Sequence, residues 1–185
     1  GGAAVYNLDG TLTILNSTIA DNYSPIGQAI SSYSWGSSTG TQIRVANSIL
    51  YNGGDEIWAN DSSAVQVTYS DVQGGWPGGT GNISANPQFR SPGDYSIEGE
   101  WIDGDYRLTS SSAALNAGSD ALLPADILDL DGDTDVSEEL PLDLDGSARV
   151  QGTRVDMGAY EGSAGSSHGY GGTLTVCIGG SCITL

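Results

Sequence analysis

Residues 2–22 have the sequence GAAVYNLDGTLTILNSTIADN, and they contain the pattern from which we infer the fold. A short apolar run ends before Gly10, a second run alternates Leu12 and Ile14 with threonines, and a third follows Asn16. Apolar residues at every second position predict strands that bury one face. Three short strands joined by Gly and Asn turns predict one coil of a repeat.

The same pattern returns twice, with a period of roughly 25 to 30 residues that is typical of solenoids. The matching segments are 2–7 with 27–32 and 54–59, 11–17 with 42–48 and 65–70, and 19–22 with 50–53 and 72–74. Equivalent strands of successive coils are expected to pair in parallel, with Val, Ile and Leu in apolar ladders inside. Asn16 and Asn47 fall at the same corner, where an asparagine tolerates a left-handed backbone and can bond to its own backbone and its stacked neighbour.

The predicted fold is all-β: a short right-handed parallel β-helix of about three coils, with a loop-rich C-terminal cap and a detached C-terminal strand tail. A β-sandwich explains the alternation but not the coil-to-coil alignment. The predicted segments are β-helix coils over 1–74, the cap with an acidic segment over 75–162, a Gly/Ser linker over 163–172 and docking strands over 173–185. The aromatic residues of 75–103 are expected to cover the open end of the apolar column, or to form a platform that stacks on sugars.

Several motifs resemble the C-terminal part of bacterial right-handed parallel β-helix proteins of the choice-of-anchor Q type. They are NSTIADN, NSILYNGG, YSDVQGG, GNISANPQF, GDYRLTSSSAALNAGS and DLDGSARVQGTRVDMGAYEG, within residues 2–162. The resemblance implies a secreted protein held at the cell surface by a C-terminal device, and it implies no activity. The tail departs from the family pattern, because it has neither a membrane helix nor a sortase-like motif.

The net charge is −18 and the chain has no lysine. Such a surface repels nucleic acid and anionic membranes, and it suits an extracellular or cell-surface protein or the binding of cations. No apolar run approaches the ~18 residues of a membrane span, so we expect no membrane insertion.

Residues 120–145 hold ten acidic side chains and no basic one. Asp129, Asp131, Asp133 and Asp135 alternate around Gly132, a spacing that can converge on Ca²⁺ through hard oxygen ligands. The pattern is not an EF-hand, because its glycine stands at the fourth place. The alternative is a solvated acidic loop that Arg149 and Arg154 partly neutralise.

The tail, residues 173–185, is uncharged and contains Cys177 and Cys182. A disulfide between them is predicted in an oxidising compartment, and separate packing of two small apolar residues is the alternative. GTLTV at 172–176 echoes GTLTI at 10–14, so the tail resembles the second and third strands of a coil. An exposed apolar strand is avoided in soluble proteins, so the tail is expected to dock.

The first coil is expected to have no capping segment before it, and the tail can complete it by strand addition. In trans, this contact produces a head-to-tail filament. In cis, a linker reach of about 35 to 40 Å exceeds the height of about 15 Å for three stacked coils. The trans arrangement is favoured because a Gly/Ser tether suits reaching a neighbour. The predicted assembly residues are Leu12, Ile14, Leu174, Val176, Ile178 and Ile183.

The predicted function is therefore that of an extracellular structural protein whose partner is itself, and not that of an enzyme. A monomeric carbohydrate-binding or adhesin module is the first alternative, and a polysaccharide lyase or hydrolase is the second. Against an enzyme stand the lack of lysine, Arg44 as the only basic residue of the coils, and a single histidine, His168, in the linker. Candidate glycan sites are Asn22, Asn60 and Asn82, whereas Asn16 fits a corner better than a glycan.

Overall fold

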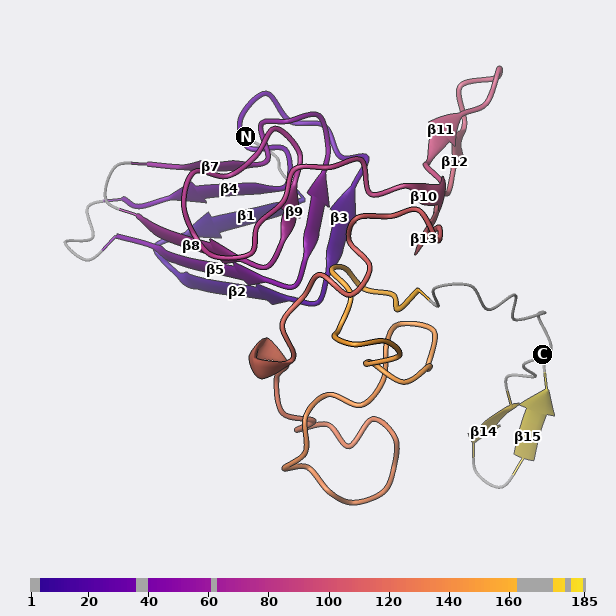
Figure 1. The fold of residues 1–185 in the computed structure, drawn as a ribbon. Helices are drawn as coiled ribbons and strands as arrows, with labels where there is room; N and C mark the ends of the chain where they lie inside the picture. Colours follow the sequence, from indigo (N-terminus) through magenta and orange to yellow (C-terminus); the bar gives the residue numbers. More distant parts are fainter. Residues whose placement is uncertain (1–3, 36–39, 61–62, 163–174, 179–180, 185) are drawn as a thin grey trace.

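The computed structural model describes residues 4–35, 40–60, 63–162, 175–178 and 181–184. Three parallel sheets of three strands each form a short parallel β-helix, which confirms the predicted fold class (Figure 1). Sheet A contains β1 (Val5–Leu8), β4 (Ile30–Tyr33) and β7 (Ile57–Ala59). Sheet B contains β2 (Thr11–Leu15), β5 (Gln42–Ala46) and β8 (Ala64–Thr68). Sheet C contains β3 (Thr18–Ala20), β6 (Ile49–Tyr51) and β9 (Asp71–Val72).

The register places like residues above one another in every sheet, as the repeat predicts. The inner ladders are Val5–Ile30–Ile57, Leu12–Ile43–Val65, Ile14–Val45–Val67 and Ile19–Leu50–Val72. These side chains form one apolar cluster, whose middle coil is 0 to 2% exposed at Ile30, Ile43, Val45 and Leu50. Burial of such apolar surface is the main favourable contribution to folding.

The corner between the second and third strands has a left-handed backbone in each coil, at Asn16, Asn47 and Tyr69. The expected bond between stacked asparagines is wrong, because the amide of Asn47 bonds to Ser119 and both amide atoms of Asn16 lack a partner. Serines link the coils instead. The hydroxyl of Ser48 accepts the N–H of Ser17, and that of Ser70 accepts the N–H of Ser48, each at 3.2 Å.

The far end of the apolar column is closed by a partial fourth turn that runs past residue 74. Trp76 packs against the inner cluster, and Ile83 forms a parallel bridge with Asp71. Asn82 continues the corner by accepting the N–H of Ser70 at 3.1 Å.

Tyr95 and Trp101 do not cover the column, contrary to expectation. They lie in the hairpin of β11 (Asp94–Tyr95) and β12 (Trp101–Ile102), which projects from the body (Figure 1), and they are 67% and 42% exposed. This hairpin extends from the antiparallel pair of β10 (Phe89–Ser91) and β13 (Asp105–Leu108).

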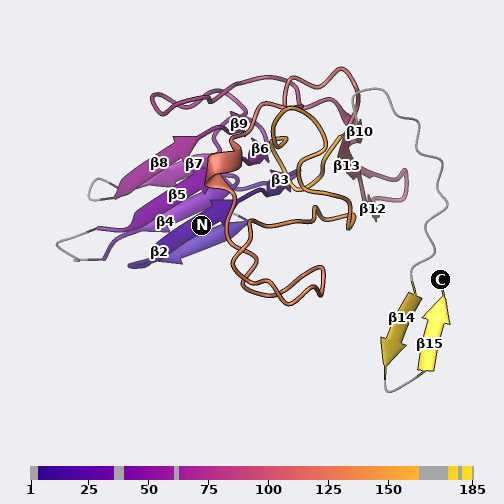
Figure 2. The ribbon, with the colours of Figure 1, turned by 60° about the horizontal axis from the view of Figure 1, so that its bottom comes forward.

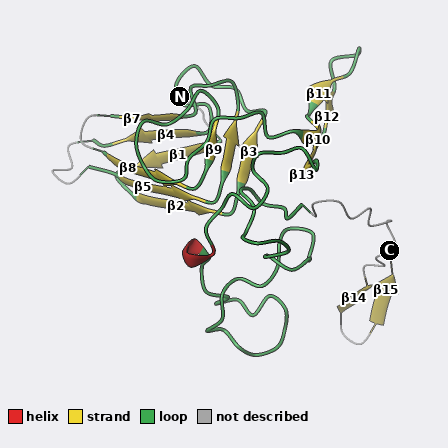
Figure 3. Ribbon diagram, viewed as in Figure 1, coloured by secondary structure: helices red, strands yellow, loops and turns green. Residues whose placement is uncertain are grey.

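The cap, mostly loop (Figure 3), packs against the outer face of sheet C (Figure 2). The outward side chain of Ile49 joins Leu108, Ala114 and Met157 in a second buried cluster. The cap contains one turn of 3₁₀ helix, η1 (Asp120–Leu122). Sheet C is thus buried on both faces, by the column inside and by the cap outside.

In the tail, β14 (Thr175–Ile178) and β15 (Ser181–Thr184) pair with each other as an antiparallel hairpin. The sequence suggested successive strands of one coil, which would not pair with each other. The difference follows from the short distance between the two strands in the sequence: Ile178 pairs with Ser181, and strands so close in sequence pair as an antiparallel hairpin.

Asp71 lies on the outer face of sheet C opposite Ile49, fully buried, with one carboxylate oxygen unpartnered. Burial raises the pKa of the Asp71 carboxyl to about 6, although the N–H of Ala85 bonds to it. Because the folded pKa exceeds the unfolded value of about 4, ionisation destabilises the fold as the pH rises through this window.

We therefore predict that Asp71→Asn raises the melting temperature by several degrees at pH 8 and leaves it nearly unchanged at pH 4, where the Asp71 carboxyl is protonated. The raised pKa of Asp71 corresponds to a loss of at most about 3 kcal/mol in the free energy of unfolding at high pH. Thermal melts followed by circular dichroism at both pH values measure this. An equal effect at both pH values contradicts the assignment.

Candidate functional site

The outer edge of the first coil is the main candidate site. β1, β2 and β3 stand at the ends of their sheets, and no strand in the described ranges pairs with their outer sides. The C=O of Gly10 accepts the N–H of Gln42 in the next coil. Because backbone direction alternates along a strand, Thr11 and Thr13 point their N–H and C=O groups outward. Such a row of backbone groups is a template for a further strand.

The apolar ladders are also incomplete at this edge. Val5, Leu12 and Ile19 are only half-buried, whereas Ile43 and Leu50 of the next coil are 2% and 0% exposed. The unpartnered amide of Asn16 belongs to the same coil. A buried polar group without a partner costs free energy. A strand added here gains backbone hydrogen bonds and apolar burial together.

The predicted assembly residues fall into two groups. Leu12 and Ile14 lie in the inner ladders, with Ile14 9% exposed. Val176, Ile178 and Ile183 lie in the tail hairpin, of which only the backbone is described, and Leu174 lies outside the described residues. The structure does not bring the two groups together within the described part of one chain, so their contact stays a prediction.

The two cysteines stand directly opposite each other in the tail hairpin, where Cys177 pairs with Cys182 and Val176 pairs with Ile183. Directly opposed positions of an antiparallel pair lie close enough for a cross-strand contact. Their sulfur atoms lie outside the described part of the chain, and the disulfide stays a prediction.

The candidate glycan asparagines are half-buried and hydrogen-bonded. Asn22 donates to Ala20 O and to Asn52 Oδ1, each at 2.9 Å. Asn60 donates to Ser34 O, and Asn82 donates to Val67 O. These amides tie neighbouring segments together, and the glycan assignment stays a prediction.

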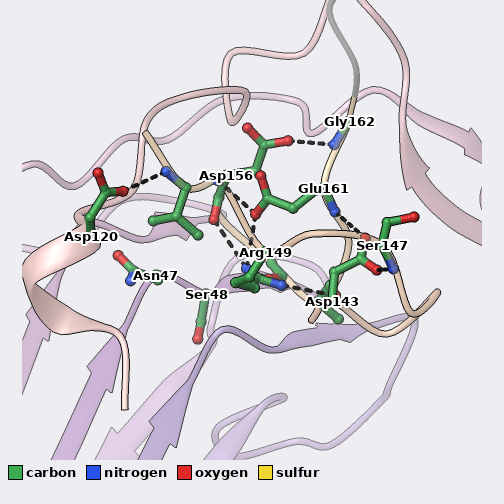
Figure 4. Close-up of polar contacts among 12 residues, drawn as sticks. Asn47, Ser48, Asp120, Asp143, Ser147, Arg149, Asp156, Glu161 and Gly162 are labelled. Carbon is green, nitrogen blue, oxygen red and sulfur yellow. Dashed lines mark hydrogen bonds and ion pairs between the residues drawn. The ribbon is translucent and has the colours of Figure 1, made fainter. Parts of the chain in front are cut away.

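A buried group of charges holds the last part of the cap (Figure 4). Arg149, 2% exposed, donates to the carbonyl oxygens of Gly158 and Ala159 at 2.7 and 3.1 Å and lies 3.4 Å from Glu161 Oε1. Asp143 accepts the N–H groups of Ser147 and Glu161. Arg149 therefore does not neutralise the loop at 129–135, contrary to the alternative drawn from the sequence.

Burial, and then the nearby Asp156 carboxylate, raise the pKa of Glu161 to about 8 and outweigh the effect of Arg149. Burial also raises the pKa of Asp156 and lowers the pKa of Arg149. Perturbed pKa values often mark functional sites. Here the polar groups bond mainly to the backbone of residues 143–162, so we interpret the network as structural, because it holds the last part of the cap in place.

The acidic loop has its own geometry. Carboxylate oxygens of Asp129, Asp131 and Asp133 lie within 4.8 Å of one another, as do those of Asp126, Asp131 and Glu138. Asp135 falls in neither group within the described ranges, and its carboxylate accepts the N–H and the hydroxyl of Ser137. Burial and then Asp131 raise the pKa of Glu138, whose buried Oε1 has no partner. Oxygen ligands in this arrangement can serve Ca²⁺, and calcium binding stays a prediction.

No family model, curated protein or solved structure matches this chain. The resemblance to choice-of-anchor Q proteins therefore stays an interpretation of the sequence. Within the described residues, no helix has the length and apolar character needed to cross a membrane.

Replacing Arg149 with lysine is predicted to destabilise the protein by about 2 to 4 kcal/mol, because a lysine cannot reproduce the guanidinium fork and leaves buried acceptors unpaired. Arg154→Lys is the matched control, because Arg154 is exposed in the same segment. Urea unfolding curves measure both variants. Equal stabilities of Arg149→Lys and Arg154→Lys contradict the structural role of Arg149 in the cap.

The calcium prediction is tested on Asp131, which belongs to both carboxylate groups. Millimolar calcium is expected to raise the melting temperature of the wild-type protein over that in chelator, since a ligand that binds the native state stabilises it. Asp131→Asn should remove the rise, and Asp135→Asn should keep it. A calcium response that persists in Asp131→Asn, or no response in the wild type, contradicts the site.

Proposed function

We propose that this protein is an extracellular structural subunit of a head-to-tail filament, in which the C-terminal hairpin of one copy completes the first coil of the next. The observation that carries the proposal is the outer edge of β1, β2 and β3, where the described chain offers backbone groups and half-buried apolar side chains without a strand partner.

The sequence echo selects the occupant and its register. Aligning GTLTV at 172–176 with GTLTI at 10–14 sets Leu174 beside Leu12 and Val176 beside Ile14. In a parallel arrangement, β14 then continues sheet B as β5 and β8 do on the other side of β2. β15 forms the outer strand of the added hairpin. Backbone hydrogen bonds supply affinity and alternate side chains supply specificity, as in other cases of strand addition.

The Gly/Ser tether favours assembly in trans. Residues 163–172 are rich in Gly and Ser, a composition typical of flexible linkers. A contact between the tail of one copy and the first coil of another joins two different surfaces, and such a heterologous contact grows into a filament unless it closes into a ring. The net charge of −18 keeps the sides of such filaments apart, since like-charged surfaces repel.

A carbohydrate-binding module and a polysaccharide-processing enzyme are the competing functions. Tyr95 and Trp101 are exposed, and their ring centroids are 5.2 Å apart. Both lie in residues 75–103, where the sequence suggested a platform that stacks on sugars, and they favour a carbohydrate-binding module. Their rings meet at 74°, so they do not form a flat platform. We therefore place the filament first and assign no catalysis.

Deletion of residues 173–185 is predicted to abolish filaments of the purified full-length chain, because the occupant of the edge is lost. Val176→Asp should have the same effect, since it places a charge in the inner ladder. Thr175→Asp is the matched control one position away and should assemble far better. Negative-stain electron microscopy measures filament length, and unchanged filaments after the deletion contradict the proposal.

A further inference from the structure

The outer faces of the three sheets differ in kind. The cap covers sheet C through Ile49 and the second buried cluster. Sheet B turns mainly polar side chains outward, among them Thr13, Arg44 and Gln66, which share one row. Sheet A turns out an aromatic face, which we define by five large apolar residues: Tyr6, Leu8, Tyr33, Trp35 and Trp58.

The register assembles this face from three coils. Tyr6, Ser31 and Trp58 form one row across the sheet, and Leu8 and Tyr33 form the next. Because neighbouring strands are ~4.8 Å apart, these side chains follow one another along the axis of the β-helix. Ser31 is 2% exposed between its larger neighbours, so the small side chain lets the rings dominate the surface.

The rings are ordered against one another, and Tyr6 and Trp35 are exposed whereas Tyr33 and Trp58 are half-buried. Those of Tyr33 and Trp58 are nearly parallel, at 9° with centroids 6.2 Å apart, and Trp35 lies 6.0 Å from Tyr33 at 55°. Asp9 holds Trp35 by accepting its backbone N–H at 2.8 Å. Tyr6 is 53% and Trp35 is 77% exposed. Exposed apolar side chains gathered on one face in this way can mark a binding site.

The charged residues around sheet A restrict the chemical class of ligand that the aromatic face can bind. The strands of sheet A carry no charged residue, and the acidic Asp9 and Asp55 flank them and are exposed. The chain has no lysine, and none of its five arginines lies in sheet A. This environment disfavours anionic glycans and favours cations, which the faces of Trp and Tyr also attract.

We propose that the aromatic face binds a polysaccharide whose sugars carry free amino groups, such as a glucosamine polymer. The apolar faces of the sugar rings stack on Trp35, Tyr33 and Trp58, and the ammonium groups lie near the rings and the carboxylates of Asp9 and Asp55. The stacking residues Tyr33, Trp35 and Trp58 belong to the second and third coils, so they lie away from the outer edge of β1, β2 and β3 that the filament uses.

The test measures binding of glucosamine oligomers to the full-length chain by isothermal titration calorimetry, with fully acetylated oligomers as the neutral probe. Trp35→Ala is the main variant, because Trp35 lies outside the strands and is mostly exposed. It should weaken binding about tenfold without changing net charge, and Trp58→Ala should do the same. Tyr23→Ala, an exposed aromatic residue outside the aromatic face, is the matched control and should leave affinity unchanged.

Asp55→Asn separates the charge from the stacking, and it should weaken binding of the glucosamine oligomer but not of the acetylated one. Equal loss of affinity in Trp35→Ala and Tyr23→Ala, or no binding at all, overturns the site. Tighter binding of acetylated oligomers overturns the choice of an amino sugar. A change of sedimentation coefficient in Trp35→Ala without any effect on sugar binding identifies the face as a contact between copies and also overturns the proposal.

Discussion

The pairing of each coil with the coil on either side is the constraint on which this structure depends. In a parallel β-helix, every strand satisfies half of its backbone groups with the coil before and half with the coil after. The same stacking aligns the apolar ladders, so hydrogen bonding and apolar burial are completed together. A terminal coil therefore lacks hydrogen-bond partners and apolar burial on its outer side. Each end of the column needs a segment that covers it.

The far end of the column is covered by a segment of the same chain. Residues after β9 form a partial fourth turn, in which Ile83 pairs with Asp71 and Trp76 covers the inner cluster. The corner motif continues there too, because Asn82 takes the place that a serine hydroxyl takes between coils. At the first coil, the described chain shows no equivalent of this turn on the outer side of β1, β2 and β3. The filament proposal assigns that role to a second copy.

The inner architecture was predictable because its signals are local and periodic. Alternation at Leu12 and Ile14, repeated at Ile43 and Val45, predicted the ladders and their register. Asn16 and Asn47 predicted the left-handed corner, since asparagine tolerates that backbone. The serine links between coils were missed, although Ser17, Ser48 and Ser70 recur in register.

Features that depend on long-range packing were not predictable in the same way. Arg149 looked like a surface neutraliser, but the cap closes over it and turns it towards backbone carbonyls. Sequence spacing alone could not decide between a calcium site and a solvated acidic loop. The second carboxylate group includes Asp126 and Glu138, which lie outside the alternating run. The aromatic face was missed because Tyr6, Tyr33 and Trp58 lie far apart in sequence and meet only through the register.

A cryo-electron microscopy map of the purified full-length assembly, at a resolution that separates strands, tests the proposed contact between copies. We predict that the strand spacing of ~4.8 Å continues without a break across the subunit boundary, with residues 173–178 of one copy paired in parallel with β2 of the next. A boundary at which β2 has no strand from a neighbouring copy, or a preparation that contains only monomers, would contradict it.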